Sequence, residues 1–144
     1  ILASKRIDEV PNNVFVESSR INSTFGGNLV DMVRFKIILE TIKEEKLLKN
    51  SKDMGDYLLL KLKDLESNYP AYMTNSRGLG LWAAFDLPSM TERDELWSKM
   101  MDNKLLILTS GDKSIRFRPH LTTGKKEIDH ALDIIDFSMK KCLK

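Results

Sequence analysis

The chain has 144 residues and a mass of 16.6 kDa, with 42% hydrophobic and 31% charged residues. This length suits one domain, since domains contain about 100 to 200 residues, and the composition is typical of an ordinary globular protein. The 23 Lys and Arg against 21 Asp and Glu give a formal net charge of +2. Binding to nucleic acid or to an anionic membrane would need a clustered excess of one sign, so neither partner is expected.

A single cysteine, Cys142, cannot form an intrachain disulfide, and no Cys and His spacing resembles a zinc site. A reducing, cytoplasmic location therefore fits best. No apolar run approaches the roughly 20 residues that cross a bilayer. The chain opens at Ile1 without an initiator Met or the charged-then-apolar order of a secretion signal. We therefore expect it to be cut from a longer protein.

Residues 1–27 predict a mostly irregular lead-in, because Pro11, the Asn12-Asn13 pair and the Gly26-Gly27 pair interrupt any periodicity. One short strand is expected near residues 14–16.

Two helices are predicted next. Apolar residues recur at helical spacing from Asn28, the expected N-cap, to about Asn50. A second helix is expected from about Ser51, ending at Asn68 and Pro70.

Strand formers follow at residues 72–74 and 81–85, and the glycine-containing stretch 77–80 between them predicts a turn or a bulge. A third helix is expected over residues 91–103, with Thr91 as its N-cap and Asp94 at the capping-box position.

Two more strands are predicted at residues 105–108 and 114–118, and a last helix at residues 125–142. Helices and strands do not alternate strictly, as they would in a parallel doubly wound fold. The predicted class is α+β, with a mainly antiparallel sheet of about three or four strands and helices on one face.

The stretch 18–28 crowds hydroxyls, amides and two glycines immediately before a helix. Free N–H groups at a helix N-terminus, with short hydroxyl side chains, form a ready anion site. A tight turn followed by a helix cap explains the same residues, so the local pattern leaves both interpretations open.

In the stretch 114–119, strand alternation places Arg116 and Arg118 on one face, opposite Ile115 and Phe117. An arginine that points into a cleft can clamp a carboxylate bidentately. A solvated arginine face, or an arginine paired with a structural acid, is the competing interpretation. The sequence contains no nucleophile elbow, zinc-protease motif or phosphate loop.

Three stretches taken in order, residues 22–28, 77–81 and 115–119, resemble the C-terminal part of class III aminotransferases, which use pyridoxal 5'-phosphate. The longer run 19–34 is most similar to the lysine ε-aminotransferase (L-lysine 6-transaminase) branch of this family. The resemblance covers essentially the whole chain. It implies the small C-terminal domain of a fold-type I transferase in residues 28–144, preceded in residues 1–27 by the cofactor-phosphate loop.

The resemblance also implies residue roles. Thr24, helped by Ser23, corresponds to the hydroxyl donor to the cofactor phosphate, and it reaches the active site of the neighbouring subunit of a homodimer. Arg116 corresponds to the arginine that takes a substrate carboxylate, and Asn22 lines the substrate end of that pocket. The Schiff-base lysine is expected upstream of Ile1, so no catalytic residue and no metal ligand is expected within the chain.

The implied function of the parent protein is transfer of the ε-amino group of L-lysine to 2-oxoglutarate, with the chain alone inactive. One alternative is an aminotransferase for 4-aminobutyrate or another ω-amino acid such as ornithine, since the Arg-Phe-Arg-Pro run is shared with that branch. The other is a stand-alone α+β module that binds acidic ligands through its Arg116 face. The expected partners are small-molecule substrates.

Overall fold

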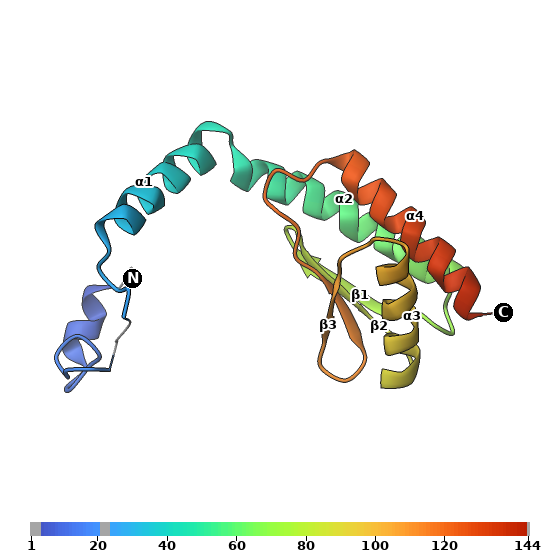
Figure 1. Ribbon diagram of the computed structural model, residues 1–144, viewed down its shortest axis with the longest axis horizontal. Helices are drawn as coiled ribbons and strands as arrows, with labels where there is room; N and C mark the ends of the chain where they lie inside the picture. Colours follow the sequence, from blue (N-terminus) through green and yellow to red (C-terminus); the bar gives the residue numbers. More distant parts are fainter. Residues whose placement is uncertain (1–3, 21–23, 144) are drawn as a thin grey trace. The chain divides into compact units, whose positions relative to one another are not determined.

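Four antiparallel strands form one sheet in the order β1-β2-β4-β3 (Figure 1). The computed structural model describes residues 4–20 and 24–143. The strands are β1 (Thr74–Leu79), β2 (Trp82–Asp86), β3 (Leu108–Ser110) and β4 (Ser114–Phe117). The central pair, β2 and β4, joins residues about 30 positions apart in the sequence, so its register fixes which distant side chains become neighbours.

Three helices cover one face of this sheet. Helix α2 (Leu47–Asn68) packs on β1 and β2, α3 (Met90–Asp102) packs on β3 and β4, and α4 (Lys125–Cys142) packs on α2 and α3. Alternate strand residues face these helices and are buried: Ala83, Phe85, Ile115 and Phe117. The predicted α+β class, with an antiparallel sheet and helices on one face, is confirmed.

The β1–β2 hairpin corrects the strand prediction for this region. Residues 77–79 belong to β1, and the turn is the two-residue step Gly80-Leu81 between the paired residues Leu79 and Trp82. Gly80 has φ +55°, a conformation that favours glycine. The register shifts between Thr74 and Arg77, so the strand also contains a bulge.

The helix boundaries differ from the prediction at two points. The first long helix, α1 (Leu29–Glu44), ends before a break in which Lys46 has φ +54°, and α2 begins directly afterwards at Leu47 rather than at Ser51. The N-cap of α3 is Ser89 rather than Thr91, because the Ser89 side chain accepts the Thr91 N–H at 3.1 Å.

Strand β3 begins at Leu108, later than the predicted start at residue 105. The preceding residues are bonded to α3 instead: the Leu105 N–H donates to the Met100 oxygen at 3.0 Å, and Trp97 Nε1 donates to the Ile107 oxygen at 2.9 Å. These contacts hold the chain against the end of the helix, so pairing with β4 starts only afterwards. The last helix, α4, is confirmed at residues 125–142.

The chain divides into two compact units, residues 1–40 and residues 41–144. The first contains the 3-10 helix Lys5–Glu9 and most of α1. The predicted strand near residues 14–16 is wrong: this segment is a turn organised by Asn13, whose backbone oxygen accepts from the Val16 and Glu17 N–H groups at 3.0 Å. The functional division expected after residue 27 stays a prediction.

No helix among the described residues combines the length and the apolar character needed to cross a membrane.

Candidate functional site

The polar side chains of interest lie on the sheet face opposite the three packed helices. Ala84 of β2 pairs with Arg77 of β1 on one side and with Arg116 of β4 on the other. Directly paired residues project to the same face of a sheet, so the two arginines flank the small Ala84 methyl group. A shallow hollow of about 220 Å³ lies at this row, and Trp82 and Ser110 also line it.

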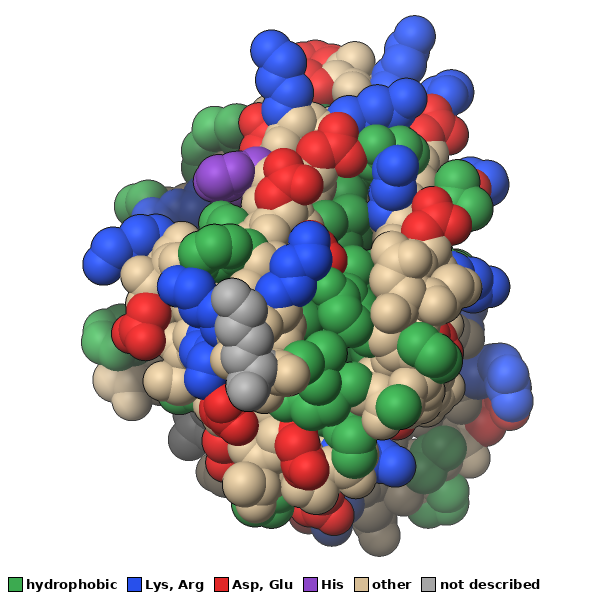
Figure 2. Space-filling view, turned by 90° about the vertical axis from the view of Figure 1, so that its right-hand side faces the viewer, with side chains coloured by type: hydrophobic (Ala, Val, Ile, Leu, Met, Phe, Trp, Pro, Cys, Tyr) green, Lys and Arg blue, Asp and Glu red, His purple; other side chains and the backbone are tan. Residues whose placement is uncertain are grey.

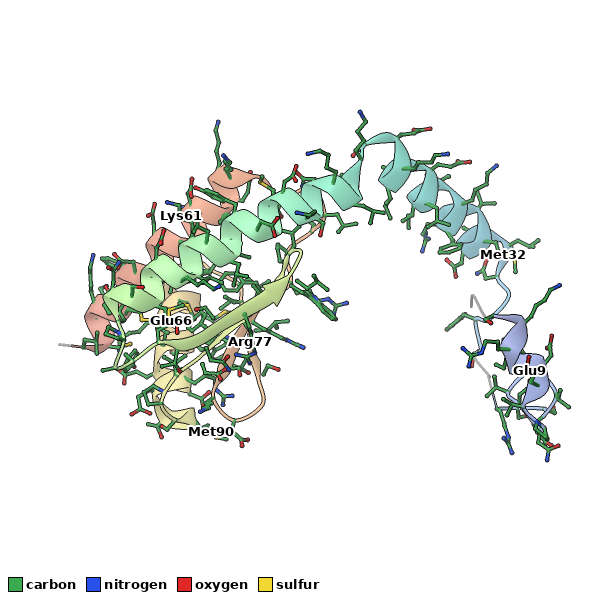
Figure 3. The ribbon with its side chains drawn as sticks, turned by 180° about the vertical axis from the view of Figure 1, so that it is seen from behind. Glu9, Met32, Lys61, Glu66, Arg77 and Met90 are labelled. Carbon is green, nitrogen blue, oxygen red and sulfur yellow. The ribbon has the colours of Figure 1, made fainter. Side chains whose placement is uncertain are left out.

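Arg77, which Figure 3 labels on β1, is tied to the carboxylate of Asp86. Its Nη1 donates to Asp86 Oδ1 and to the Asn75 backbone oxygen, both at 2.9 Å, and its Nη2 donates to Ser114 Oγ at 3.2 Å. Asp86 also accepts from Ser114 Oγ at 2.6 Å and from Asn75 Nδ2 at 2.8 Å. We call these four residues, Asn75, Arg77, Asp86 and Ser114, the Asp86 network.

The Asp86 side chain is only 9% exposed. Burial acts to raise the pKa of this carboxyl group, but hydrogen bonds from Ser114, Asn75 and Arg77, together with the Arg77 charge, outweigh burial and hold the pKa below its usual value. Asp86 is therefore an ionised partner for Arg77 at neutral pH and is not a proton donor.

Arg116 is exposed and pairs through its backbone with β2 and β3, but its side chain makes no ion pair or hydrogen bond within residues 4–20 and 24–143. Arg118 behaves differently, because its guanidinium lies over the Trp82 ring, 5.7 Å from the ring centroid, in a cation–π arrangement. A guanidinium without a protein partner can clamp a carboxylate through two parallel N–H bonds. Arg116 is thus open to an external carboxylate, whereas Arg118 is stacked.

A second hollow, of about 370 Å³, lies between the β3–β4 edge and α4. Its apolar lining includes Leu58, Leu105, Ile107, Phe117, Ile128 and Ala131. Arg116 and His120 also contribute to it. The His120 ring is held within the local turn, with Nδ1 at 2.8 Å from Thr122 Oγ1 and 3.3 Å from Thr123 Oγ1. These contacts stabilise the turn that leads into α4.

The loop before α1 carries the predicted phosphate-binding hydroxyl. Thr24 is exposed, and Gly27 has φ +78° with no atom close to the position that a Cβ would occupy. Asn28 caps the helix as predicted, since its Oδ1 accepts the Val30 N–H at 2.9 Å. Asn22 and Ser23 lie outside the described residues. An open glycine loop with an exposed hydroxyl at a helix N-terminus fits a phosphate group.

No group of three metal-ligating side chains occurs in the described part of the chain. On the face shown in Figure 2, Lys and Arg side chains are interspersed with Asp and Glu. This face therefore presents no uniform patch of one charge to a polyanion.

The comparison with known families shows which family the chain belongs to. The sequence profile described as Aminotransferase class-III matches residues 3–139. The chain belongs to the class III aminotransferase family. Arg77, Asp86 and Arg116 all lie within the matched segment, so they belong to the aminotransferase part of the chain.

The relatives of this class III chain include aminotransferases named for different amino donors. The chain is 44% identical to the L-lysine-epsilon aminotransferase of Mycobacterium tuberculosis (strain ATCC 25618 / H37Rv) over 132 residues. This alignment covers 92% of this chain and 29% of the relative. It is 44% identical to the enzyme of the same name from Streptomyces clavuligerus, over 96% of this chain and 31% of the relative. The probable mitochondrial 4-aminobutyrate aminotransferase of Caenorhabditis elegans is 32% identical over 86% of this chain and 26% of the relative.

A solved lysine aminotransferase from M. tuberculosis superimposes with a TM-score of 0.87 at 41% identity, covering 98% of this chain and 32% of that chain. The class III chain therefore spans about a third of the length of the proteins it matches.

Sequence reasoning missed the Asp86 network. Asp86 follows two buried strand positions, and alternation places it on the same face as Ala84 and Trp82. A carboxylate at the end of a strand was the available signal. Its partners could not be named, because they depend on strand register across up to 37 positions of sequence.

Proposed function

We propose that the full-length protein containing this chain transfers the ε-amino group of L-lysine to 2-oxoglutarate with pyridoxal 5'-phosphate as cofactor. The observation that carries the proposal is the open Arg116 guanidinium on the sheet face, in a chain 44% identical to L-lysine-epsilon aminotransferases and 32% identical to a 4-aminobutyrate aminotransferase. Family membership favours this activity over a stand-alone module that binds acidic ligands.

In this proposal Arg116 takes the carboxylate that the two substrates share, and Asn22 lines the same pocket. Thr24, with Ser23, holds the phosphate of the cofactor and reaches the active site of the neighbouring subunit in a homodimer. When bound, pyridoxal 5'-phosphate supplies an electron sink for the carbon that loses a proton. We also propose a cytoplasmic location, small-molecule substrates, and no nucleic-acid or membrane partner.

The first experiment compares amino donors in the full-length protein. With 2-oxoglutarate as acceptor, glutamate formation should show a higher kcat/KM for L-lysine than for 4-aminobutyrate or L-ornithine. A higher kcat/KM for 4-aminobutyrate would support the alternative branch instead. The 144-residue chain alone should form no glutamate, because it spans only 29% to 31% of the lysine enzymes it matches.

The second experiment changes Arg116 to Lys in the full-length protein. A charge-assisted hydrogen bond contributes about 1.5 to 3 kcal/mol, so the loss of bidentate geometry should lower kcat/KM for lysine and for 2-oxoglutarate about 10- to 100-fold. The matched control is Arg118→Lys, because Arg118 is stacked on Trp82. Equal losses in the two variants would argue against a specific role for Arg116.

The third experiment tests the cofactor loop. Thr24→Val removes the hydroxyl and keeps the side-chain volume, and it should weaken retention of pyridoxal 5'-phosphate about 10-fold or more during dialysis, followed by absorbance. Thr24→Ser keeps the hydroxyl and should retain the cofactor. Unchanged retention in Thr24→Val would contradict the assignment.

A further inference from the structure

The sheet face of Arg116 carries a second guanidinium that the proposed function does not use. Arg77 and Arg116 each pair with Ala84, from opposite sides. Their Cα atoms are thus two strand spacings apart, roughly 10 Å. Both side chains line the hollow of about 220 Å³, and arginine side chains are long enough to converge across a methyl group. Position alone would make this a two-arginine site.

Asp86 prevents that arrangement. Its carboxylate draws the Arg77 guanidinium along the face to a point where it also bonds Ser114 and the Asn75 backbone. The Arg77 side chain is 46% exposed whereas the Asp86 side chain is 9% exposed, so the acid is the fixed partner and the arginine is the one brought to it. Arg116, one strand beyond Ala84, has no comparable acid among the described residues.

We propose that Asp86 is a specificity-determining residue, which pairs with Arg77 and neutralises it so that Arg116 is the unpaired guanidinium that this face offers to an incoming carboxylate. The inference rests on the proposed function for its biological meaning. L-Lysine brings one carboxylate beside a positively charged α-ammonium group, whereas 2-oxoglutarate brings two carboxylates. A second free guanidinium beside Arg116 would repel the amino acid and favour the diacid. With Arg77 neutralised, one arginine can serve both substrates in turn.

The test uses the 144-residue chain and two probes of equal length, glutarate with two carboxylates and pentanoate with one. Nitrogen-resolved NMR of the arginine Nε–H groups follows each titration. In the unsubstituted chain, glutarate should shift the Arg116 signal and leave the Arg77 signal in place. An Arg77 signal that moves as far as that of Arg116 would overturn the proposal without any variant.

The decisive variant is Asp86→Asn, which keeps the shape of the side chain and removes its charge. Arg77 should then respond to glutarate, and the affinity ratio of glutarate to pentanoate should rise about threefold to fivefold, the scale of a partly exposed ion pair. A ratio equal to that of the unsubstituted chain, with the affinity for pentanoate retained, would refute the role of Asp86. A loss of fold alone would lower both affinities together and leave the ratio unchanged.

Three controls separate the possible causes. Asp112→Asn makes the same change in net charge in the exposed β3–β4 turn and should leave the ratio unchanged. Asp86→Glu keeps the charge and should retain the original ratio. Arg77→Gln added to Asp86→Asn should remove the gain, since the second guanidinium is then absent.

The proposed function and this inference can fail separately. If glutarate leaves Arg116 unmoved in the unsubstituted chain, the carboxylate role of Arg116 is wrong. The response of the Arg77 signal to glutarate in Asp86→Asn can still be measured in that case. Whether this response appears decides the role of Asp86.

Discussion

Tyr69 shows how single side chains join the elements of the second unit. It stands at the end of α2, and its hydroxyl donates to Asp136 Oδ1 of α4 at 2.6 Å, while Lys140 Nζ donates to Asp136 Oδ2. Burial raises the pKa of Tyr69 to about 12, and the hydrogen bond and charge of Asp136 act in the same direction. The folded chain therefore holds a proton that the unfolded chain releases near pH 10.

This difference predicts alkaline destabilisation. Because the folded pKa is raised, the contribution of Tyr69 is fully present below about pH 10 and is lost as pH rises towards about 12. In Tyr69→Phe the free energy of unfolding, measured by urea titration from pH 8 to pH 12, should fall less steeply than in the unsubstituted chain. Lysine deprotonation is common to both proteins and cancels in the comparison. Identical slopes would contradict the prediction.

At this same scale, the sequence could predict Arg116 but not its surroundings. Strand alternation and a motif of adjacent residues were enough to place Arg116 on one face with Arg118. The difference between Arg116 and Arg118 depends on Trp82 of the β1–β2 hairpin, because its ring stacks against the Arg118 guanidinium. The neutralisation of Arg77 depends on Asp86, nine positions away across a turn. Such contacts are set by tertiary pairing, for which a single sequence carries no local signal.

The boundaries of the helices and strands were harder to predict than the presence of each element. The helical pattern runs without interruption through the break between α1 and α2, because Lys46 takes its φ of +54° without glycine or proline nearby. The start of α3 offered two hydroxyl residues, Ser89 and Thr91, and either satisfies the N-cap pattern. The predicted turn covered residues 77–80 because both Gly78 and Gly80 suggested a turn. Only Gly80 has a positive φ, and the turn in the structure is Gly80-Leu81.

Helix α2 meets the hairpin through a close approach of two glycines. A Cβ added to Gly55 would lie 2.2 Å from the backbone carbon and oxygen of Gly80. Alanine normally stabilises a helix relative to glycine by about 1 kcal/mol, but here overpacking by about 1 to 3 kcal/mol or more opposes that gain. Gly55→Ala should therefore lower the free energy of unfolding in urea despite its helical propensity.

Gly111 provides the matched comparison. It has φ +55° in the β3–β4 turn, and nothing lies within 4 Å of its would-be Cβ. Gly111→Ala should cost about 1 to 2 kcal/mol from backbone strain alone, with the β1–β2 hairpin unaffected. Amide exchange at residues 78–82 should accelerate in Gly55→Ala and not in Gly111→Ala. Equal protection of the hairpin in both variants would show that the contact of α2 with the hairpin is not tight.

At the scale of the molecule, the two units differ in how they bury apolar surface. The second unit has the core between sheet and helices, whereas α1 has no buried residue. Its exposed apolar side chains include Leu29, Val30, Val33, Ile37 and Ile38. A helix that is apolar around its circumference is normally buried in a protein, and the relatives are about three times as long as this chain. In a protein as long as those relatives, segments outside this chain would be available to cover α1.

Without that cover, the isolated chain should associate with itself through α1. Sedimentation velocity at increasing protein concentration should show a rising mean sedimentation coefficient, and added salt should not reduce it, because salt screens charges and not apolar contacts. The double variant Val33→Glu with Ile37→Glu should remain monomeric, since two carboxylates one helical turn apart oppose burial of that face. The control is Leu79→Glu at the end of β1 in the second unit, where the side chain is 89% exposed. If Leu79→Glu abolishes association as completely as the double variant, the contact surface lies in the second unit and not on α1.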